Sequence, residues 1–220
     1  MRPEWTKNTI IVSILILIFI SIGSGCQRQE ALSDGQIAAL RETYPATGLT
    51  GSEFMDKISP TMEEANKVVE FWAQVKCVGA AEDIYISSNP GNDDSAIAAI
   101  ESKLGAEIPA EHHFICYEME IIECFSGPKK AGDRFILMVE DFDLSVAPDF
   151  LNGKTWIVGT YHTHLSSLAD REELYIFYSD LTFYVTEDNY VLSVSGSENK
   201  ADYSGITIRE WEERLKIILK

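Results

Sequence analysis

The stretch TWIVGTYHTH, residues 155–164, is a run of β-branched and aromatic residues that ends in two histidines. Residues of these types favour a β-strand. Because successive side chains of a strand point to opposite faces, His162 and His164 project to the same side while Thr163 points away. The stretch therefore predicts a strand that presents two imidazoles to one point.

Strands are predicted on both sides of this stretch. Residues 112–125 and 134–142 are strand-like and are joined by SGPKKAGD, a loop with glycine and proline turn signals, so they are expected to be antiparallel neighbours. Shorter strands are predicted at 82–87 and 189–196. These segments indicate a central, mostly antiparallel sheet.

Helices are predicted between and after the strands. SPTMEEANKVVEFWAQVK, residues 59–76, combines Ser59 as N-cap and Pro60 at the first helical position with apolar residues at helical spacing. Further helices are predicted at 34–44, 93–105, 179–188 and 207–220. The order of elements describes one mixed α/β domain over residues 59–220 with helices flanking the sheet.

The N-terminus has a different character. Two basic residues precede a charge-free apolar run at 9–22, and small residues then lead to Cys26. Residues 1–25 read as a signal peptide, and the segment resembles the lipobox of bacterial lipoproteins, which implies lipidation of Cys26 and attachment to a membrane. The alternative is an uncleaved anchor, although a span needs about 20 apolar residues. Either reading places the chain in the bacterial cell envelope, facing the periplasm or exterior, with residues 26–58 as a tether.

Charge and cysteine content limit the partners. The formal net charge of −17 repels nucleic acid, so no nucleic-acid partner is expected. Cys77, Cys116 and Cys124 are an odd number in a compartment where thiols oxidise. They read either as one disulfide with a cysteine left over or as small buried core residues.

The paired histidines suggest a metal site. Zinc in hydrolytic sites takes three protein ligands and a water, and Asp180 is the carboxylate best placed by sequence to join His162 and His164. A nearby carboxylate would accept the proton of the zinc-bound water, and Glu111, at the head of the long β stretch, is the candidate base. Taken singly, each of these residues also fits an ordinary surface or cap position.

This pattern resembles the JAB/MPN superfamily, whose JAMM metalloproteases carry a glutamate strand, then His-x-His, then Ser-x-x-Asp. EHHFIC, GTYHTH and FYSD match these pieces in order, over about residues 94–196. The resemblance implies a JAB/MPN-type fold, bound zinc and an oxyanion-stabilising serine. That serine position holds Phe177, and Ser179 is the nearest substitute.

Two functions follow as expectations. The first is a membrane-attached, zinc-dependent hydrolase of the metallopeptidase or isopeptidase type, acting on a peptide or protein. The second is a non-catalytic binding or immunity-type envelope lipoprotein, which the missing serine favours.

Overall fold

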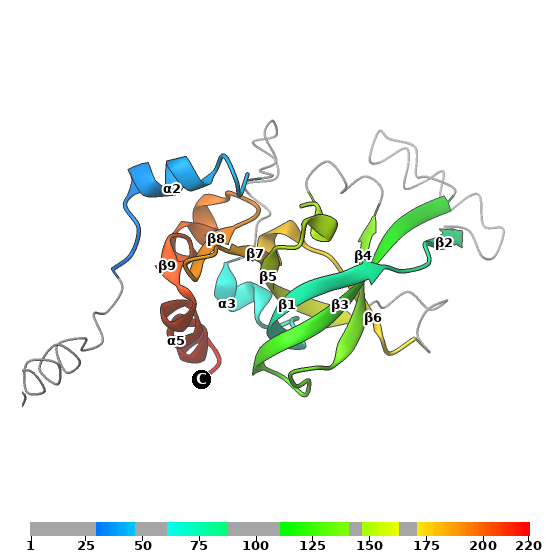
Figure 1. Ribbon diagram of the computed structural model, residues 1–220. Helices are drawn as coiled ribbons and strands as arrows, with labels where there is room; N and C mark the ends of the chain where they lie inside the picture. Colours follow the sequence, from blue (N-terminus) through cyan, green and yellow to red (C-terminus); the bar gives the residue numbers. More distant parts are fainter. Residues whose placement is uncertain (1–29, 47–60, 88–110, 141–146, 163–170) are drawn as a thin grey trace, which may run out of the picture. The chain divides into compact units, whose positions relative to one another are not determined.

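The computed structural model describes residues 30–46, 61–87, 111–140, 147–162 and 171–220 (Figure 1). All of these except Glu30 belong to the compact unit Ala31–Lys220. The predicted helix at 93–105 lies outside the described residues, as do His164 and Cys26.

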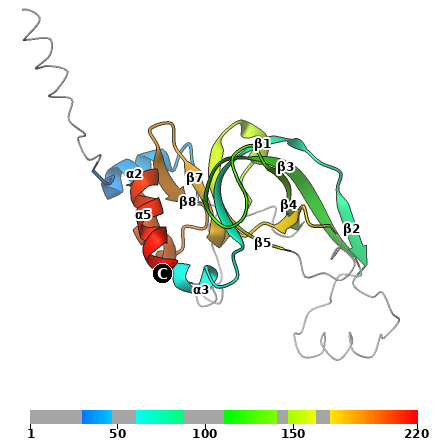
Figure 2. The same ribbon diagram turned by 90° about the horizontal axis from the view of Figure 1, so that it is seen from below.

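Five strands close into a barrel (Figure 2). They are β1 (Phe71–Ala80), β3 (Glu111–Ser126), β4 (Arg134–Glu140), β6 (Leu174–Ile176) and β5 (Thr155–His162), in that spatial order. Pairing of β5 with β1 completes the ring, and only the β4–β6 contact within it is parallel. The strands β1, β3 and β4 form an antiparallel meander, and β5 returns to lie beside β1. This connection is a Greek key, which also occurs in the five-stranded barrels of the OB type.

Four further strands extend the barrel. The strands β7 (Thr182–Val185), β8 (Tyr190–Ser193) and β9 (Ile206–Thr207) continue the sheet from the first half of β5, while β2 (Ile84–Ser87) pairs with the start of β3. In the described residues the sheet thus has nine strands. The expected mixed α/β class with a mostly antiparallel sheet is confirmed, as is the antiparallel β3–β4 pair.

The side chains of β1 and β5 alternate between two apolar cores. Phe71, Val75, Trp156 and Val158 pack in the barrel interior, whereas Trp72 and its neighbours pack outside it. This alternation follows from the period of two along a strand, which gives a barrel wall an inner and an outer face. His162 falls on the inner face by the same count, at the end of the barrel.

A second layer covers the outer core. The helix α5 (Ile208–Ile218) begins at Thr207, whose side chain accepts a hydrogen bond from the Glu210 amide, and it buries Trp211 against Trp72 at 5.3 Å between ring centroids. The C-terminal helix predicted from sequence is confirmed. Also in this layer are α3 (Met62–Ala65) and the 3₁₀ turns η4 (Ser179–Leu181) and η5 (Glu198–Tyr203). No helix within the described ranges is long and apolar enough to cross a membrane.

Two of the predicted helices are wrong. Within residues 59–76 only α3 is helical, and β1 follows from Phe71. Within 179–188 a single 3₁₀ turn leads into β7. In both places aromatic and β-branched residues dominate the second half of the segment. Their spacing fits a helix as well as a strand, and packing in the sheet decides for the strand.

Residues 31–46, within the segment expected to be a tether, pack on the sheet beside β7 and β8 (Figure 1). The predicted short helix is confirmed as α2 (Asp34–Leu40), and Tyr44 behind it is buried in the interior core. Arg41 Nη1 donates to the Ser193 carbonyl at 2.8 Å, and Lys154, on a loop beside the turn η2 (Phe150–Asn152), lies 4.7 Å from the Tyr44 ring centroid. These contacts hold the segment in place.

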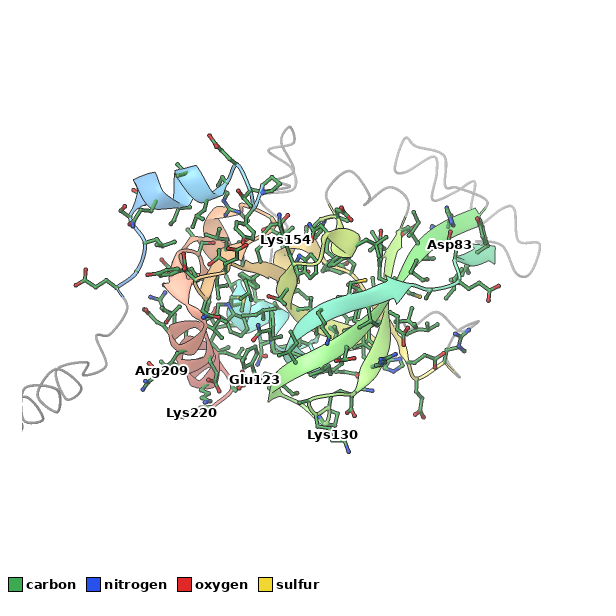
Figure 3. All side chains as sticks on the ribbon, in the orientation of Figure 1. Asp83, Glu123, Lys130, Lys154, Arg209 and Lys220 are labelled. Atoms are coloured by element: carbon green, nitrogen blue, oxygen red, sulfur yellow. The ribbon has the colours of Figure 1, made fainter. Side chains whose placement is uncertain are left out.

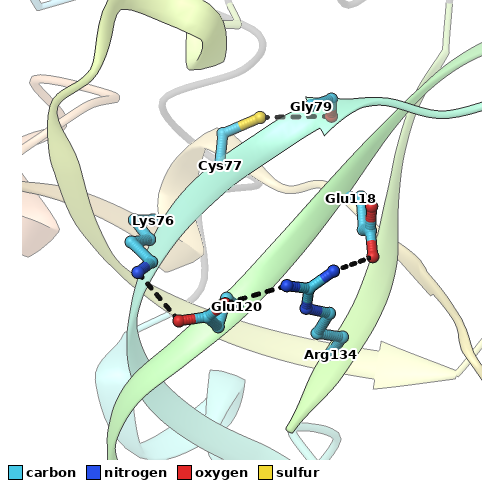
Figure 4. Close-up of polar contacts among 6 residues, drawn as sticks. All are labelled: Lys76, Cys77, Gly79, Glu118, Glu120 and Arg134. Atoms are coloured by element: carbon cyan, nitrogen blue, oxygen red, sulfur yellow. Dashed lines mark hydrogen bonds and ion pairs between the residues drawn. The ribbon is translucent and has the colours of Figure 1, made fainter. Parts of the chain in front are cut away.

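The outer face of β1, β3 and β4 carries alternating charges (Figure 4). Glu120 contacts Lys76 at 2.8 Å and Arg134 at 3.3 Å, and Arg134 also contacts Glu118 at 2.9 Å. Exposed pairs of this kind are screened by solvent and add little to stability. Their charges are matched with one another, as expected for a solvated face.

Candidate functional site

A pocket of about 660 Å³ lies between α3, the end of β5 and η4. We refer to it as the His162 pocket. It is lined by Glu64, Ala65, Lys67, Val68, Glu70, Tyr161, His162, Tyr178 and Leu181. The folding of residues 66–70 as a link between α3 and β1, in place of a continued helix, is what brings α3 over the end of β5.

Two tyrosines form an aromatic pair in this pocket. Tyr161 points outward from β5, Tyr178 precedes η4, and their ring centroids are 5.3 Å apart with planes tilted by 58°. Tyr178 is 47% exposed and Val68 is 61% exposed. A concave site that combines exposed apolar side chains with a few polar groups is the usual form of a ligand pocket.

His162 lies at the rim with a defined hydrogen bond. Its Nε2 is 2.9 Å from the Glu172 carbonyl oxygen, and its ring centroid is 4.7 Å from that of Tyr175. A carbonyl only accepts, so Nε2 donates the hydrogen of this bond. His162 is therefore oriented by the protein.

Tyr175 fixes the carboxylate of Glu70. Burial, followed by the charge and the hydrogen bond of Glu70, raises the pKa of the Tyr175 hydroxyl to about 12. The hydroxyl thus stays protonated and donates to Glu70. This bond places an acidic group at the pocket rim beside His162.

Glu64 supplies a second fixed carboxylate. Its Oε2 accepts from the Thr61 amide at 2.9 Å and from the Thr61 hydroxyl at 3.2 Å, while Thr61 caps α3 in return. These hydrogen bonds, that of the amide first, lower the pKa of Glu64, so the group is ionised at neutral pH.

Asp180 faces a different neighbour. It is 9% exposed, it does not line the His162 pocket, and its Oδ1 has no hydrogen-bond partner among the described residues. Lys200 of η5 is fully buried; burial lowers its pKa, and the charge of Asp180 is the largest effect raising it. Asp180 is thus the counter-charge of a buried lysine in the outer layer.

Glu111 is remote from His162 along the sheet. His162 pairs with Tyr175, which pairs with Leu137, which pairs with Tyr117. Glu111 lies six residues before Tyr117 on β3, about 20 Å of strand. Its backbone pairs with β2, at the far end from α3 in both ribbon views (Figures 1 and 2).

Phe177, at the position where the resemblance implies an oxyanion-stabilising serine, is a core residue. The residue is 2% exposed in the barrel interior, with its ring 5.7 Å from that of Phe150. A serine there would leave a core position unfilled. Ser179, two residues on, begins η4 and is half-buried, and it is not among the residues that line the pocket.

The described residues contain no group of three or more His, Cys, Asp or Glu that could hold a metal. Of the four residues expected to surround zinc, His162 and Asp180 have described side chains, and they lie in different environments. The three described cysteines are free thiols, and Cys116 and Cys124 share one strand, too far along it to bridge. Burial raises the pKa of Cys116 to about 11, which keeps it a neutral core residue.

Sequence reasoning missed the tyrosine pair and Glu64. Tyr161 stands directly before the histidine that was singled out, but an isolated aromatic on a strand is more often core. Glu64 sits in a segment predicted to be a longer helix, and Tyr178 directly precedes another predicted helix, so neither was expected at a pocket. Neither a protein-family model nor a curated protein shows significant similarity to this chain.

Proposed function

We propose that the chain is a non-catalytic binding protein of the bacterial envelope, attached to the membrane through a lipid on Cys26. Its ligand, part of a peptide or protein, occupies the His162 pocket. The observation that carries this proposal is the exposed ring of Tyr178, packed against the partly buried Tyr161, inside a concave site.

Several features support binding over catalysis. The polar groups around the pocket are held by the protein: His162 by a backbone carbonyl, Glu70 by Tyr175, and Glu64 by Thr61. Five-stranded Greek-key barrels frequently serve as binding modules, which is an argument by analogy of fold alone. The net charge of −17 argues against nucleic acid as the ligand.

Photo-crosslinking in the native host tests this proposal. A photoreactive phenylalanine derivative at Val68, which is 61% exposed in the pocket, should give a discrete crosslinked product at the membrane. The same group at Tyr85, 60% exposed on β2, is the matched control and should not. Identical products at both positions, or none at Val68, would contradict the proposal, and Cys26→Ala should release the protein from the membrane.

A zinc-dependent hydrolase on a JAB/MPN-type fold is the second candidate. It is favoured by the hydrogen bond from Nε2 of His162 to a carbonyl, since metal-binding histidines commonly donate their second ring nitrogen in this way. In this candidate His162, His164 and Asp180 would hold zinc, with Glu111 as base and Ser179 at the oxyanion. The donor set fits only in part, because Asp180 lies beside Lys200 and Glu111 is remote along β3.

Metal analysis distinguishes the two candidates. If the hydrolase is correct, the protein lacking residues 1–25 binds zinc, His162→Ala and His164→Ala each weaken that binding, and Glu111→Gln abolishes amide hydrolysis with zinc retained. A protein that purifies without zinc, and whose binding of added zinc is unchanged in His164→Ala, excludes this candidate.

A further inference from the structure

We infer that the group received by the His162 pocket is an organic cation, the lysine or arginine side chain of a peptide. This inference rests on the proposed function and specifies its ligand. It comes from three features of the described residues: the geometry of the tyrosine pair, the carboxylates at the rim, and the charge of the chain.

Tyr178 offers a ring face to a ligand. Its ring packs against that of Tyr161, with centroids 5.3 Å apart and planes tilted by 58°, so Tyr161 supports it from β5. A cation within about 6 Å of a ring centroid is attracted by the negative face of the ring. Since Tyr178 is 47% exposed, a ligand can reach its face without a rearrangement of the barrel.

The carboxylates supply the opposite charge. Glu64 and Glu70 line the pocket and are both exposed to solvent, while each is oriented by a hydrogen bond within the protein. Among the described residues of the lining, Lys67 is the one cation. An ammonium or guanidinium group that lies on the Tyr178 ring beside these carboxylates therefore meets more negative than positive charge, whereas a carboxylate ligand is repelled.

The net charge of the chain also favours a cationic ligand. The net charge is −17, which draws cationic partners from a distance and raises their association rate. The buried cation Lys200 is opposed by the charge of Asp180 first, and then by those of Glu63 and Glu64. Val68 and Leu181 provide apolar contact for the methylene stem of a lysine or arginine, which favours a side chain over a bare metal ion.

Calorimetric titration of the full chain in non-ionic detergent tests the inference with three peptides. These are acetyl-Gly-Lys-Gly-amide, the same peptide with norleucine, which keeps the stem and removes the charge, and the same peptide with glutamate. The lysine peptide should bind about tenfold more tightly than the norleucine peptide, as a partly desolvated cation–aromatic contact implies. The glutamate peptide should bind most weakly.

Substitutions test whether Tyr178 and Glu70 produce the preference for the lysine peptide. Tyr178→Ala should remove the preference for lysine, and Tyr178→Phe should retain most of it because the ring face remains. Glu70→Gln should weaken the lysine peptide about threefold, as expected for one exposed charge contact, and leave the norleucine peptide unchanged. Tyr85→Ala, an exposed tyrosine of β2, is the matched control and should change nothing.

The outcomes separate the two proposals. Equal affinities for the lysine and norleucine peptides, both lost in Tyr178→Ala, would overturn the cation inference and keep the pocket as a binding site. Affinities that are the same in the unmodified chain and in Tyr178→Ala for every peptide would overturn both.

Discussion

Histidines occur at both ends of the barrel, in contrasting surroundings. At the β2 end, Nδ1 of His112 contacts Glu140, and Nε2 of His113 is 3.1 Å from Asp83. Tyr85 stacks flat on the His113 ring, with centroids 4.4 Å apart and planes 6° from parallel. At the pocket end, His162 donates a hydrogen bond to a backbone carbonyl, and the ring planes of Tyr161 and Tyr178 are tilted by 58°.

The contrast shows how similar residues can make a structural cluster or a binding site. At the β2 end, marked by Asp83 in Figure 3, each histidine has a carboxylate and the aromatic ring covers an imidazole. At the pocket end the carboxylates of Glu64 and Glu70 are oriented but remain exposed, and the ring of Tyr178 is 47% exposed. Geometry, more than composition, separates the two ends.

The largest expected effect comes from Asp180, which the sequence assigns to the His162 end. Asp180→Asn removes the counter-charge that acts most strongly on the buried Lys200 and should lower the free energy of unfolding by about 3–5 kcal/mol. Urea unfolding followed by tryptophan fluorescence measures this loss. Peptide binding at the His162 pocket should be unchanged in the fraction that remains folded.

A second substitution tests whether the loss of stability comes from the charge of Lys200. Asp180→Asn combined with Lys200→Met should recover most of the loss, because the uncompensated charge is gone. Asp202→Asn, an exposed aspartate in the same turn as Lys200, should change stability by less than about 0.5 kcal/mol. If Asp180→Asn is as mild as Asp202→Asn, Asp180 is not the partner of Lys200.

Tyr175 gives the pocket end a specific alkaline sensitivity. Its folded-state pKa of about 12 lies above the ordinary value of 10.0, so the folded protein holds the phenolic proton more tightly than the unfolded chain does. The resulting stabilisation is complete below pH 10 and is lost as the pH rises from 10 to 12. Tyr175→Phe should reduce this decline by on the order of 1–2 kcal/mol, measured by urea unfolding at a series of pH values. An unchanged decline would contradict the burial of the hydroxyl.

The smallest effect distinguishes the histidines themselves. His113→Ala removes a stacked ring and a partner of Asp83, and should cost about 1 kcal/mol of stability. His162→Ala removes one hydrogen bond to an exposed carbonyl and should cost about half as much, on the low side for a hydrogen bond. Thermal unfolding compares the two variants. A greater loss in His162→Ala would mean that His162 is the structural residue.

Much of the sheet is predictable from the sequence. The runs that form β3, β4, β5 and β8 are long or strongly β-branched, and the turn residues between β3 and β4 give their antiparallel pairing. The amphipathic helix α5 is equally clear. Closure of the barrel is not predictable, because it depends on β6, three residues in a polar stretch, and on the return of β5 to β1.

The candidate site is predictable only in part. His162 is correctly placed at the end of a strand, and it lines a pocket. Its partners could not be identified from the sequence. The short 3₁₀ turn η4 leaves Tyr178 exposed and Asp180 buried, and the sequence does not show at which residue such a short turn begins. The pairing of Asp180 with Lys200, twenty residues later, depends on the outer layer, which local sequence does not specify.

Chemical-shift mapping of the isotope-labelled protein with acetyl-Gly-Lys-Gly-amide tests the central claim most directly. The backbone amides of Val68, Tyr161 and Tyr178 should shift together as the peptide is added, while those of Tyr85, His112 and His113 stay in place. Shifts that gather at the β2 end, or amides that remain unmoved at both ends, would contradict the assignment of the His162 pocket as the binding site.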